Sequence, residues 1–337
     1  MLKIKQQKLF LPTAENELSI VFIIIILYTM YIYFMQKVHT YNNLTWIDIM
    51  NPTREEVMNI MAQYHLAPYI AEELLTPSPR PKVDVFEDCL FLVLHFPSTN
   101  DSKTTETPDE HEIDFIIGQE ALITTHYHPI ESIIEFEKMI EYSSIMDRDN
   151  LGTNGGFLFT HLVRTIYKNL DATIATFNNQ LRNIETKIFS GEEQAMVSDL
   201  SSLNRRILDY RRSLRFQGIT LAELERHATP ILGRECEYLF NRLGAHYREL
   251  MNTLDSDKQL LEDLQKTNDM LLTTRTNNIM RIVGILAFIL IPLSIGVDII
   301  VAFEMMERYP MNAIIVLLSS IVVILIMIAL FTKKRWL

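Results

Sequence analysis

Cysteine and positive charge are both scarce in this chain. Its 337 residues include 2 cysteines, Cys89 and Cys236, which lie far apart and match no metal-binding or redox spacing, so a reducing compartment suits them. Its 31 lysines and arginines are outnumbered by 42 aspartates and glutamates, which gives a net charge of -11. This balance argues against a nucleic-acid partner and favours either plain solubility or the attraction of cations.

The sequence also lacks the motifs of catalysis. The glycine-rich stretch 152–156 has no preceding strand and no following Lys-Ser/Thr, so it is neither a phosphate loop nor a dinucleotide motif, and we interpret it as a linker. No nucleophile stands beside a base, so nothing supports an enzyme. His126 and His128 have the strand spacing of a two-ligand metal site, but no third ligand is evident, and we interpret them as surface or sheet residues.

Two long apolar runs, 282–303 and 311–331, dominate the last part of the chain. Each reaches the roughly 20 residues that a helix needs to cross about 30 Å of hydrocarbon. The connecting residues 304–310 are too few for a domain and too polar for lipid. We therefore predict a two-helix transmembrane hairpin with a short outer loop.

The charges around these runs predict their topology. Arg275 and Arg281 precede the first run and a basic tail, 332–337, follows the second, whereas the loop carries Glu304 and Glu307. By the positive-inside rule the loop lies outside, and the large N-terminal domain and the C-terminus are cytoplasmic. We expect a multi-pass protein of the plasma or inner membrane, with membrane lipid as one partner.

Residues 1–37 contain a third apolar run, 18–35, that is just long enough to span a membrane. A spanning helix here would export the three lysines that precede it, contrary to the usual charge bias. Two alternatives stay open. The run is an extra helix, or translation starts near Met35 and the upstream part is a mis-assigned start.

Strand and helix patterns alternate within 38–156, which predicts a cytosolic α/β domain built as an α/β/α sandwich. The expected strands are 45–48, 89–96, 112–117 and 121–125, and the expected helices are 54–61, 66–75 and 130–140.

From residue 157 onward no strand pattern returns. We predict a helical part of the domain, 157–231, and then a stalk helix, 232–281, that continues without interruption into the first membrane run. A helix of this length seldom stands alone, because its apolar stripe is buried in a bundle or in a cyclic homo-oligomer.

Several blocks, in this order and spacing, resemble the CorA family of magnesium and divalent-cation channels. The blocks are 46–49 (Trp-Ile-Asp-Ile) with 51–53 (Asn-Pro-Thr), 80–83 (Arg-Pro-Lys-Val) with 91–97 (Phe-Leu-Val-Leu-His-Phe-Pro), 113–115 (Ile-Asp-Phe) with 122–124 (Leu-Ile-Thr), 275–281 (Arg-Thr-Asn-Asn-Ile-Met-Arg) with 291–294 (Ile-Pro-Leu-Ser), and 333–337 (Lys-Lys-Arg-Trp-Leu). The resemblance extends from about residue 45 to residue 337.

The resemblance implies a funnel-shaped homopentamer whose stalk helices line an axial pore. It implies passive conduction of divalent cations, Mg2+ first, with no permanently bound cofactor and with Mg2+, Co2+, Ni2+ or Zn2+ as the transported and regulatory ion. Two alternatives remain: a zinc, cobalt or nickel transporter of the same fold, and a non-conducting CorA-like regulatory protein of the membrane.

The chain departs from the family at the outer end of the first membrane helix. The family's Gly-Met-Asn signature is replaced there by Val301, Ala302 and Phe303, and the one similar tripeptide ends in Asn312, after the loop. Asn312 is either a displaced ion contact or a polar residue at the membrane interface.

One face of the first membrane helix, followed in steps of three and four, is predicted to line the pore. Its members are Asn277, Met280, Gly284, Ala287, Ile291, Ser294 and Asp298. The resemblance assigns Asn277, Met280 and Ile291 to pore-lining positions, where apolar rings could close the path by dewetting. The alternative is that this stripe only packs helices together.

Asp298 is the sole ionisable residue in the sequence between Arg281 and Glu304, and a carboxylate in a bilayer is costly unless it faces water or a partner. We predict a ring of Asp298 carboxylates at the outer mouth, where Glu304, Glu307 and Asn312 add to the attraction of cations. The alternative is a contact between Asp298 and a neighbouring helix.

Regulation is predicted from the same resemblance. In the family, acidic residues between subunits bind the transported ion and hold the channel shut. Where the stalk would offer such an acid, this chain has Asn241 and Arg242. We therefore take Asp84, Glu87 and Asp88 as the candidate regulatory metal ligands.

Overall fold

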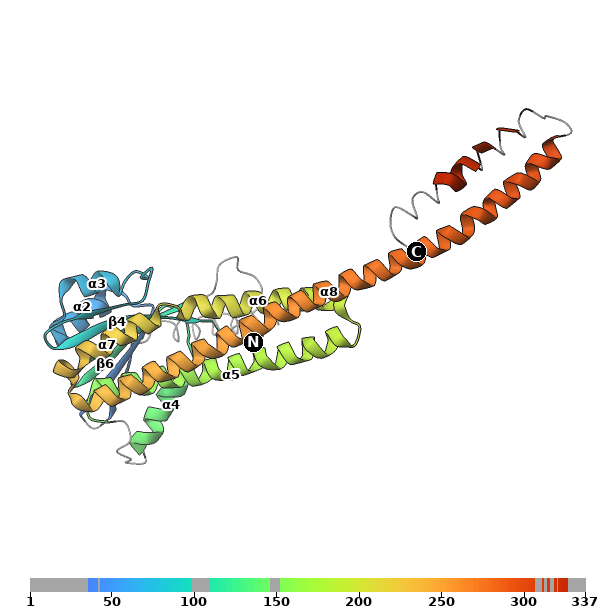
Figure 1. The fold of residues 1–337 in the computed structure, drawn as a ribbon. Coiled ribbons are helices and arrows are strands. Elements are labelled where there is room, and N and C mark those ends of the chain that lie inside the picture. The colour runs from blue at the N-terminus through green and yellow to red at the C-terminus, as the bar shows by residue number, and fades with distance from the viewer. Residues whose placement is uncertain are drawn as a thin grey trace, which may run out of the picture. The chain divides into compact units, whose positions relative to one another are not determined.

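The computed structural model describes residues 36–41, 43–98, 110–145, 152–306, 311, 314–315, 318–319 and 321–326 (Figure 1). The chain forms two compact units. The first unit comprises Met1–Lys187 and Ser198–Asp263, and the second comprises Ile188–Val197 and Leu264–Leu337. The apolar run 18–35 and the basic tail 332–337 lie outside the described residues.

A mixed sheet of six strands forms the centre of the first unit, in the order β1-β2-β6-β5-β4-β3. The β2–β6 pair is parallel and the other neighbouring pairs are antiparallel. The strands are β1 (Gln36–Tyr41), β2 (Leu44–Met50), β3 (Lys82–Val85), β4 (Cys89–Pro97), β5 (Glu110–Gly118) and β6 (Ala121–His126). The helices are α2 (Arg54–Tyr64), α3 (Pro68–Glu73), α4 (Glu131–Ile145), α5 (Gly155–Phe189), α6 (Glu193–Leu214), α7 (Gln217–Leu232) and α8 (Arg234–Met306).

The four predicted strands are confirmed as β2, β4, β5 and β6. The patterns missed β1 and β3, which are the two edge strands of the sheet. β4 is buried along its whole length, whereas β3 has only 4 residues, all of them at least partly exposed. An edge strand buries less apolar surface, so its sequence carries a weaker apolar pattern.

Helices α2 and α3 cover one face of the sheet (Figure 1). Thr53 caps α2, because the Glu56 backbone N–H donates to the Thr53 hydroxyl at 3.3 Å and the Thr53 N–H donates to the Glu56 carboxylate at 2.9 Å. The core beneath these helices contains Ile47, Ile49, Val57, Ile60, Ile70, Phe91, Val93, Ile116 and Ile123.

The opposite face of the sheet packs against α4 and α5. Trp46 of β2 meets Phe136 of α4 edge-on, with ring centroids 5.0 Å apart, and Phe115 of β5 meets Phe159 of α5 at 5.1 Å. Side chains alternate between faces along a strand, so Phe115 and its neighbour Ile116 serve opposite layers. The first unit thus has the α/β/α layering that the sequence predicts.

The stretch predicted as a linker, 152–156, instead contains the start of α5 at Gly155. The Asn154 side chain caps this helix, since its carbonyl oxygen accepts from the Gly156 N–H at 2.9 Å and its amide donates to the last carbonyl of α7 at 2.8 Å. A Cβ at position 155 would lie 2.4 Å from the Ala121 carbonyl oxygen, so only glycine fits. The linker prediction was wrong for Gly155 and Gly156, which begin α5, whereas residues 152–154 are not helical.

The long helix predicted from residue 232 begins two residues later. Leu232 ends α7, and Gly233, with φ 85°, separates α7 from α8. Helix α8 then runs from Arg234 to Met306 as 73 residues, or about 110 Å at about 1.5 Å per residue. The continuity expected between the stalk and the run 282–303 is confirmed. Glu304, expected in the loop, is helical instead.

Candidate functional site

The part of α8 in the second unit exposes a long apolar surface. Most large apolar side chains within 282–303 are exposed, from 45 % for Val301 to 65 % for Ile300, while Ile295 is buried. An apolar surface of this extent marks an interface with a membrane or a partner. Among the described residues, α8 is the one helix that is long and apolar enough to cross a membrane.

The second apolar run, 311–331, is described only in part. Residues 311, 314–315, 318–319 and 321–326 are helical, and their large apolar side chains are at least 45 % exposed wherever the structure gives a value for them, apart from the partly buried Ile324. The two-helix hairpin therefore stays a prediction.

All the residues of the predicted pore face lie on α8 in the second unit. At about 100° per residue they fall within an arc of roughly 100° around the helix. Gly284 and Ile291 are half-buried within the single chain. The other members are exposed: Asn277, Met280, Ala287, Ser294 and Asp298. The helix brings the set together on one face, and its lining of a pore stays a prediction.

Two of the residues predicted at the outer mouth, Asp298 and Glu304, lie on α8. Asp298 is exposed, on a helix surface that is otherwise apolar from residue 282 to residue 303 except for Ser294. An exposed carboxylate in such a place needs water, a partner or a cation. Glu307 and Asn312 lie outside the described residues.

Arg275 fixes α8 just before its apolar part. Its guanidinium donates to the Glu193 carboxylate at 2.8 Å and to the Gly191 carbonyl at 3.2 Å, and all three residues belong to the second unit. Glu193 occupies the first turn of α6, where the helix dipole favours a negative charge. The block 275–281, one of those that resemble the CorA family, is therefore bonded through Arg275 to the start of α6 and the residues just before it.

The candidate regulatory acids do not form one cluster. Asp84 of β3 pairs with Lys82 at 3.3 Å, and Lys82 also pairs with Glu73. Glu87 and Asp88 are exposed in the turn between β3 and β4. Among the described residues, these three acids do not form a set whose ligand atoms all lie within 4.8 Å of one another.

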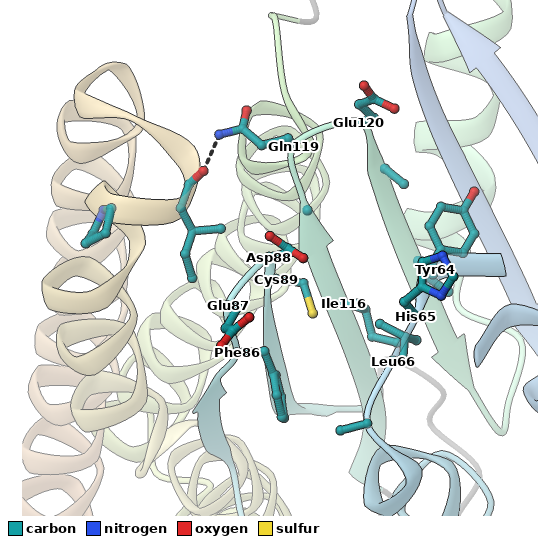
Figure 2. A pocket seen from close by; sticks show the side chains of 16 residues that line it. Tyr64, His65, Leu66, Phe86, Glu87, Asp88, Cys89, Ile116, Gln119 and Glu120 are labelled. Atoms are coloured by element: carbon teal, nitrogen blue, oxygen red, sulfur yellow. Dashed lines mark hydrogen bonds between the residues drawn. The ribbon is translucent and has the colours of Figure 1, made fainter. Parts of the chain in front are cut away.

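Glu87 and Asp88 instead line a pocket of about 670 Å³ in the first unit (Figure 2). Its described lining contains a third acid, Glu120, and neither lysine nor arginine. Cys89 also faces this pocket, and burial, followed by the charge of Asp88, raises the pKa of its thiol to about 11. The raised pKa favours the protonated thiol.

His126 and His128 do not form a two-ligand site. β6 ends at His126, so the two residues do not share a strand face. The Nδ1 of His126 lies 2.6 Å from the His128 carbonyl, and its Nε2 lies 3.3 Å from the Asp48 carboxylate. Burial opposes the charged ring, but Asp48 and the carbonyl outweigh it and raise the pKa of His126. The interpretation of His126 as a sheet residue is confirmed.

One group of potential metal ligands escaped the sequence patterns. His39 of β1 and Glu137 and Glu141 of α4 offer ligand atoms that all lie within 4.8 Å of one another. The spacing of the two glutamates places them one turn apart on a helix, which the sequence could have indicated. His39 lies on an edge strand that the patterns missed, and only the fold brings it to α4.

Comparison with known proteins places these features in a family. A family model described as "CorA-like Mg2+ transporter protein" matches residues 41–335. The "Cobalt/magnesium transport protein CorA" of Thermotoga maritima is 22% identical over 303 residues, covering 87% of this chain and 83% of that protein. The "Putative metal ion transporter YfjQ" of Bacillus subtilis is also 22% identical over 303 residues, covering 86% and 89%.

A solved structure has the same fold. The CorA magnesium transporter of Methanocaldococcus jannaschii superposes with a TM-score of 0.65 at 18% identity, covering 90% of this chain and 95% of that one. The relatives named here are transport proteins, which confirms the expectation that the chain is not an enzyme.

Proposed function

Because this chain belongs to the family of CorA-like Mg2+ transporter proteins, we propose that it conducts divalent cations passively across a cell membrane through a homopentameric pore. Mg2+ is the first candidate ion, and Co2+, Ni2+ and Zn2+ are the others. The membrane is the plasma or inner membrane, and the domain of the first unit and the C-terminus lie on its cytoplasmic side.

The observation that carries this proposal is the polar content of α8 within its apolar part. An anchoring helix needs only apolar residues, and a carboxylate within a spanning helix is costly, by up to about 2.5 to 3.5 kcal/mol at the helix centre on insertion scales and by less toward its end. Asp298 stands on the face that also carries Asn277 and Ser294, and all three are exposed. A water-filled path along this face would keep the Asp298 carboxylate hydrated, which removes the cost of burying it in lipid, and would let it attract cations.

The chemistry of this face suits a hydrated divalent cation. Five Asp298 carboxylates at the outer mouth provide hard oxygen ligands and negative charge, which attract the ion without stripping all of its water. Met280 and Ile291 provide apolar constrictions that close by dewetting. An inside-negative membrane potential then drives entry, at about 4.6 kcal/mol per divalent ion for each 100 mV.

Flux into proteoliposomes tests the proposal. The purified full-length chain is reconstituted, and the entry of Mg2+, Co2+, Ni2+ and Zn2+ is followed under an imposed inside-negative potential with an indicator dye for each ion. Conduction predicts potential-dependent Mg2+ entry. If only Co2+, Ni2+ or Zn2+ enters, the chain is a zinc, cobalt or nickel transporter of the same fold. If no ion enters, the alternative of a non-conducting regulatory protein is supported.

The same assay tests Asp298. Asp298→Asn removes the charge and should lower flux at submillimolar Mg2+ by roughly tenfold, as expected for about 1.4 kcal/mol of lost attraction. The matched control is Asp269→Asn, the same change at an exposed position of α8 before the apolar part. Equal flux in the two variants would contradict the assignment of Asp298 to the path.

A further inference from the structure

We propose that His39, Glu137 and Glu141 form a binding site in the first unit for a transition-metal dication of the Zn2+, Co2+ or Ni2+ class. Each residue offers one ligand atom, and the three atoms lie within 4.8 Å of one another. The site lies between the edge strand β1 and helix α4, which are also joined by the Lys37–Glu137 ion pair at 2.7 Å.

His39 has a ring nitrogen that is free to bind a metal ion. Its Nε2 is buried and has no hydrogen-bond partner among the described residues, although a buried ring nitrogen usually has one. This atom points at the Glu137 carboxylate, whose Oε1 lies 3.5 Å away, too far for a good hydrogen bond. A cation between the two atoms would satisfy both.

The imidazole distinguishes between metals. Two ligands held about 2.1 Å from a tetrahedral zinc lie about 3.4 Å apart, so the separation of 3.5 Å between His39 Nε2 and Glu137 Oε1 can accommodate one ion. An imidazole ligand favours zinc, cobalt and nickel over magnesium, which prefers oxygen alone.

The remaining contacts leave room for the ion. Lys37 engages Oε2 of Glu137, so Oε1 stays available, and Glu141 is exposed, so water can complete the coordination shell. His39 is held in place by stacking on Trp46, with ring centroids 5.0 Å apart and planes at 24°. A bound metal would therefore clamp β1 to α4 and lie close to the indole of Trp46.

Trp46 provides a local readout of the site. The chain contains 2 tryptophans, Trp46 and Trp336, so a Trp336→Phe background isolates the signal of Trp46. The full-length protein in detergent, stripped of metal with a chelator, is titrated with Co2+, which quenches a nearby indole. We expect saturable quenching, reversal by Zn2+, no reversal by an equal concentration of Mg2+, and a higher unfolding temperature with Zn2+.

Variants decide whether the cluster is responsible. Glu141→Gln removes an exposed ligand and should weaken Co2+ binding by about tenfold or more, since even outer-shell changes at metal sites cost about 10- to 100-fold. Glu131→Gln, the same change at an exposed position of α4, should leave the titration unaltered. His39→Asn should abolish saturable quenching, and its unfolding temperature in chelator reports whether the fold is intact.

Two results would overturn the site: equal Co2+ titrations for Glu141→Gln and Glu131→Gln, or Mg2+ displacing Co2+ as effectively as Zn2+. The readout is equilibrium binding in detergent and does not require conduction. If Co2+ quenches Trp46 but the protein conducts no ion, the proposed function is contradicted and the metal site is not. If the protein conducts but Co2+ does not quench Trp46, the metal site is contradicted and the proposed function is not.

Discussion

Asp114 is a buried carboxyl in the middle of β5. The Thr125 hydroxyl donates to one of its oxygens at 2.9 Å, and the other oxygen has no hydrogen-bond partner among the described residues. Burial and then the nearby Glu112 carboxylate raise the pKa of Asp114 well above its usual value. Glu112 is held there because it accepts from the Ser78 backbone N–H at 2.9 and 2.8 Å. The folded protein therefore favours the protonated form of Asp114.

This shift predicts how stability depends on pH. The folded state binds the Asp114 proton more tightly than the unfolded state, so the contribution of this group to the free energy of unfolding falls as the pH rises from its usual pKa toward the raised one. Asp114→Asn cannot ionise, so its gain in unfolding temperature over the parent protein should be larger at pH 7 than at pH 5.

The measurement is thermal unfolding of the full-length protein in detergent, followed by Trp46 fluorescence at both pH values. Asp88→Asn is the control, because it makes the same change at an exposed position of the same unit. A gain for Asp114→Asn that is the same at both pH values would show that the buried carboxyl does not carry the dependence.

At the scale of elements, helices α2 and α5 of the first unit begin in different ways. α2 begins with a capping box formed by Thr53 and Glu56, which lie three residues apart in the sequence. α5 begins at Gly155, where the backbone passes so close to the carbonyls of Gly118 and Ala121 that a side chain would collide. A local sequence pattern reveals the start of α2. The start of α5 has the local cap Asn154, but its requirement for glycine at position 155 depends on distant carbonyls.

Glycine substitutions distinguish these cases. Gly155→Ala forces a Cβ to within 2.4 Å of one backbone oxygen, and we expect it to lower the free energy of unfolding by at least about 1 to 3 kcal/mol, as overpacked cores do. Gly244→Ala is the matched control in α8, where a Cβ meets only the flexible end of Arg248 at 3.6 Å. It should be stabilising by up to about 1 kcal/mol, because alanine favours helix.

Denaturant unfolding of the two variants under the same conditions measures both values. A Gly155→Ala protein as stable as the parent would mean that α5 can withdraw from the sheet without cost.

At the scale of the whole molecule, the sequence predicted the elements whose pattern is local. The apolar runs of β4 and β6, the periodicity of α8 and the composition of 282–303 were sufficient for the α/β layering and the long helix. The proposed metal site at His39 could not be predicted, because it joins an edge strand of weak pattern to a helix about a hundred residues away. Asp84 pairs with Lys82 two residues away on β3, a contact that strand spacing allows.

The proposed pentamer rests on the resemblance to the CorA family, and it meets a physical requirement on α8. One helix cannot enclose a path for a cation, whereas a ring of five can place the same face of each copy toward a common axis. Lipid can cover the apolar side chains, but it cannot satisfy Asp298. Met280 and Ile282 lie about 200° apart around the helix, and only Met280 is on the face predicted to meet the axis.

Cysteine cross-linking tests this arrangement. Met280 and Ile282 are equally exposed in the single chain, at 59% and 58%, so Met280→Cys and Ile282→Cys should react alike in a monomer. In the pentamer, Met280→Cys should form disulfides between subunits under mild oxidation and Ile282→Cys should not. The native Cys89 and Cys236 are buried and contribute little background. Mass measurement of the particle in lipid nanodiscs should give five copies of 39.3 kDa. Equal cross-linking at both positions, or a particle of another size, would contradict the ring.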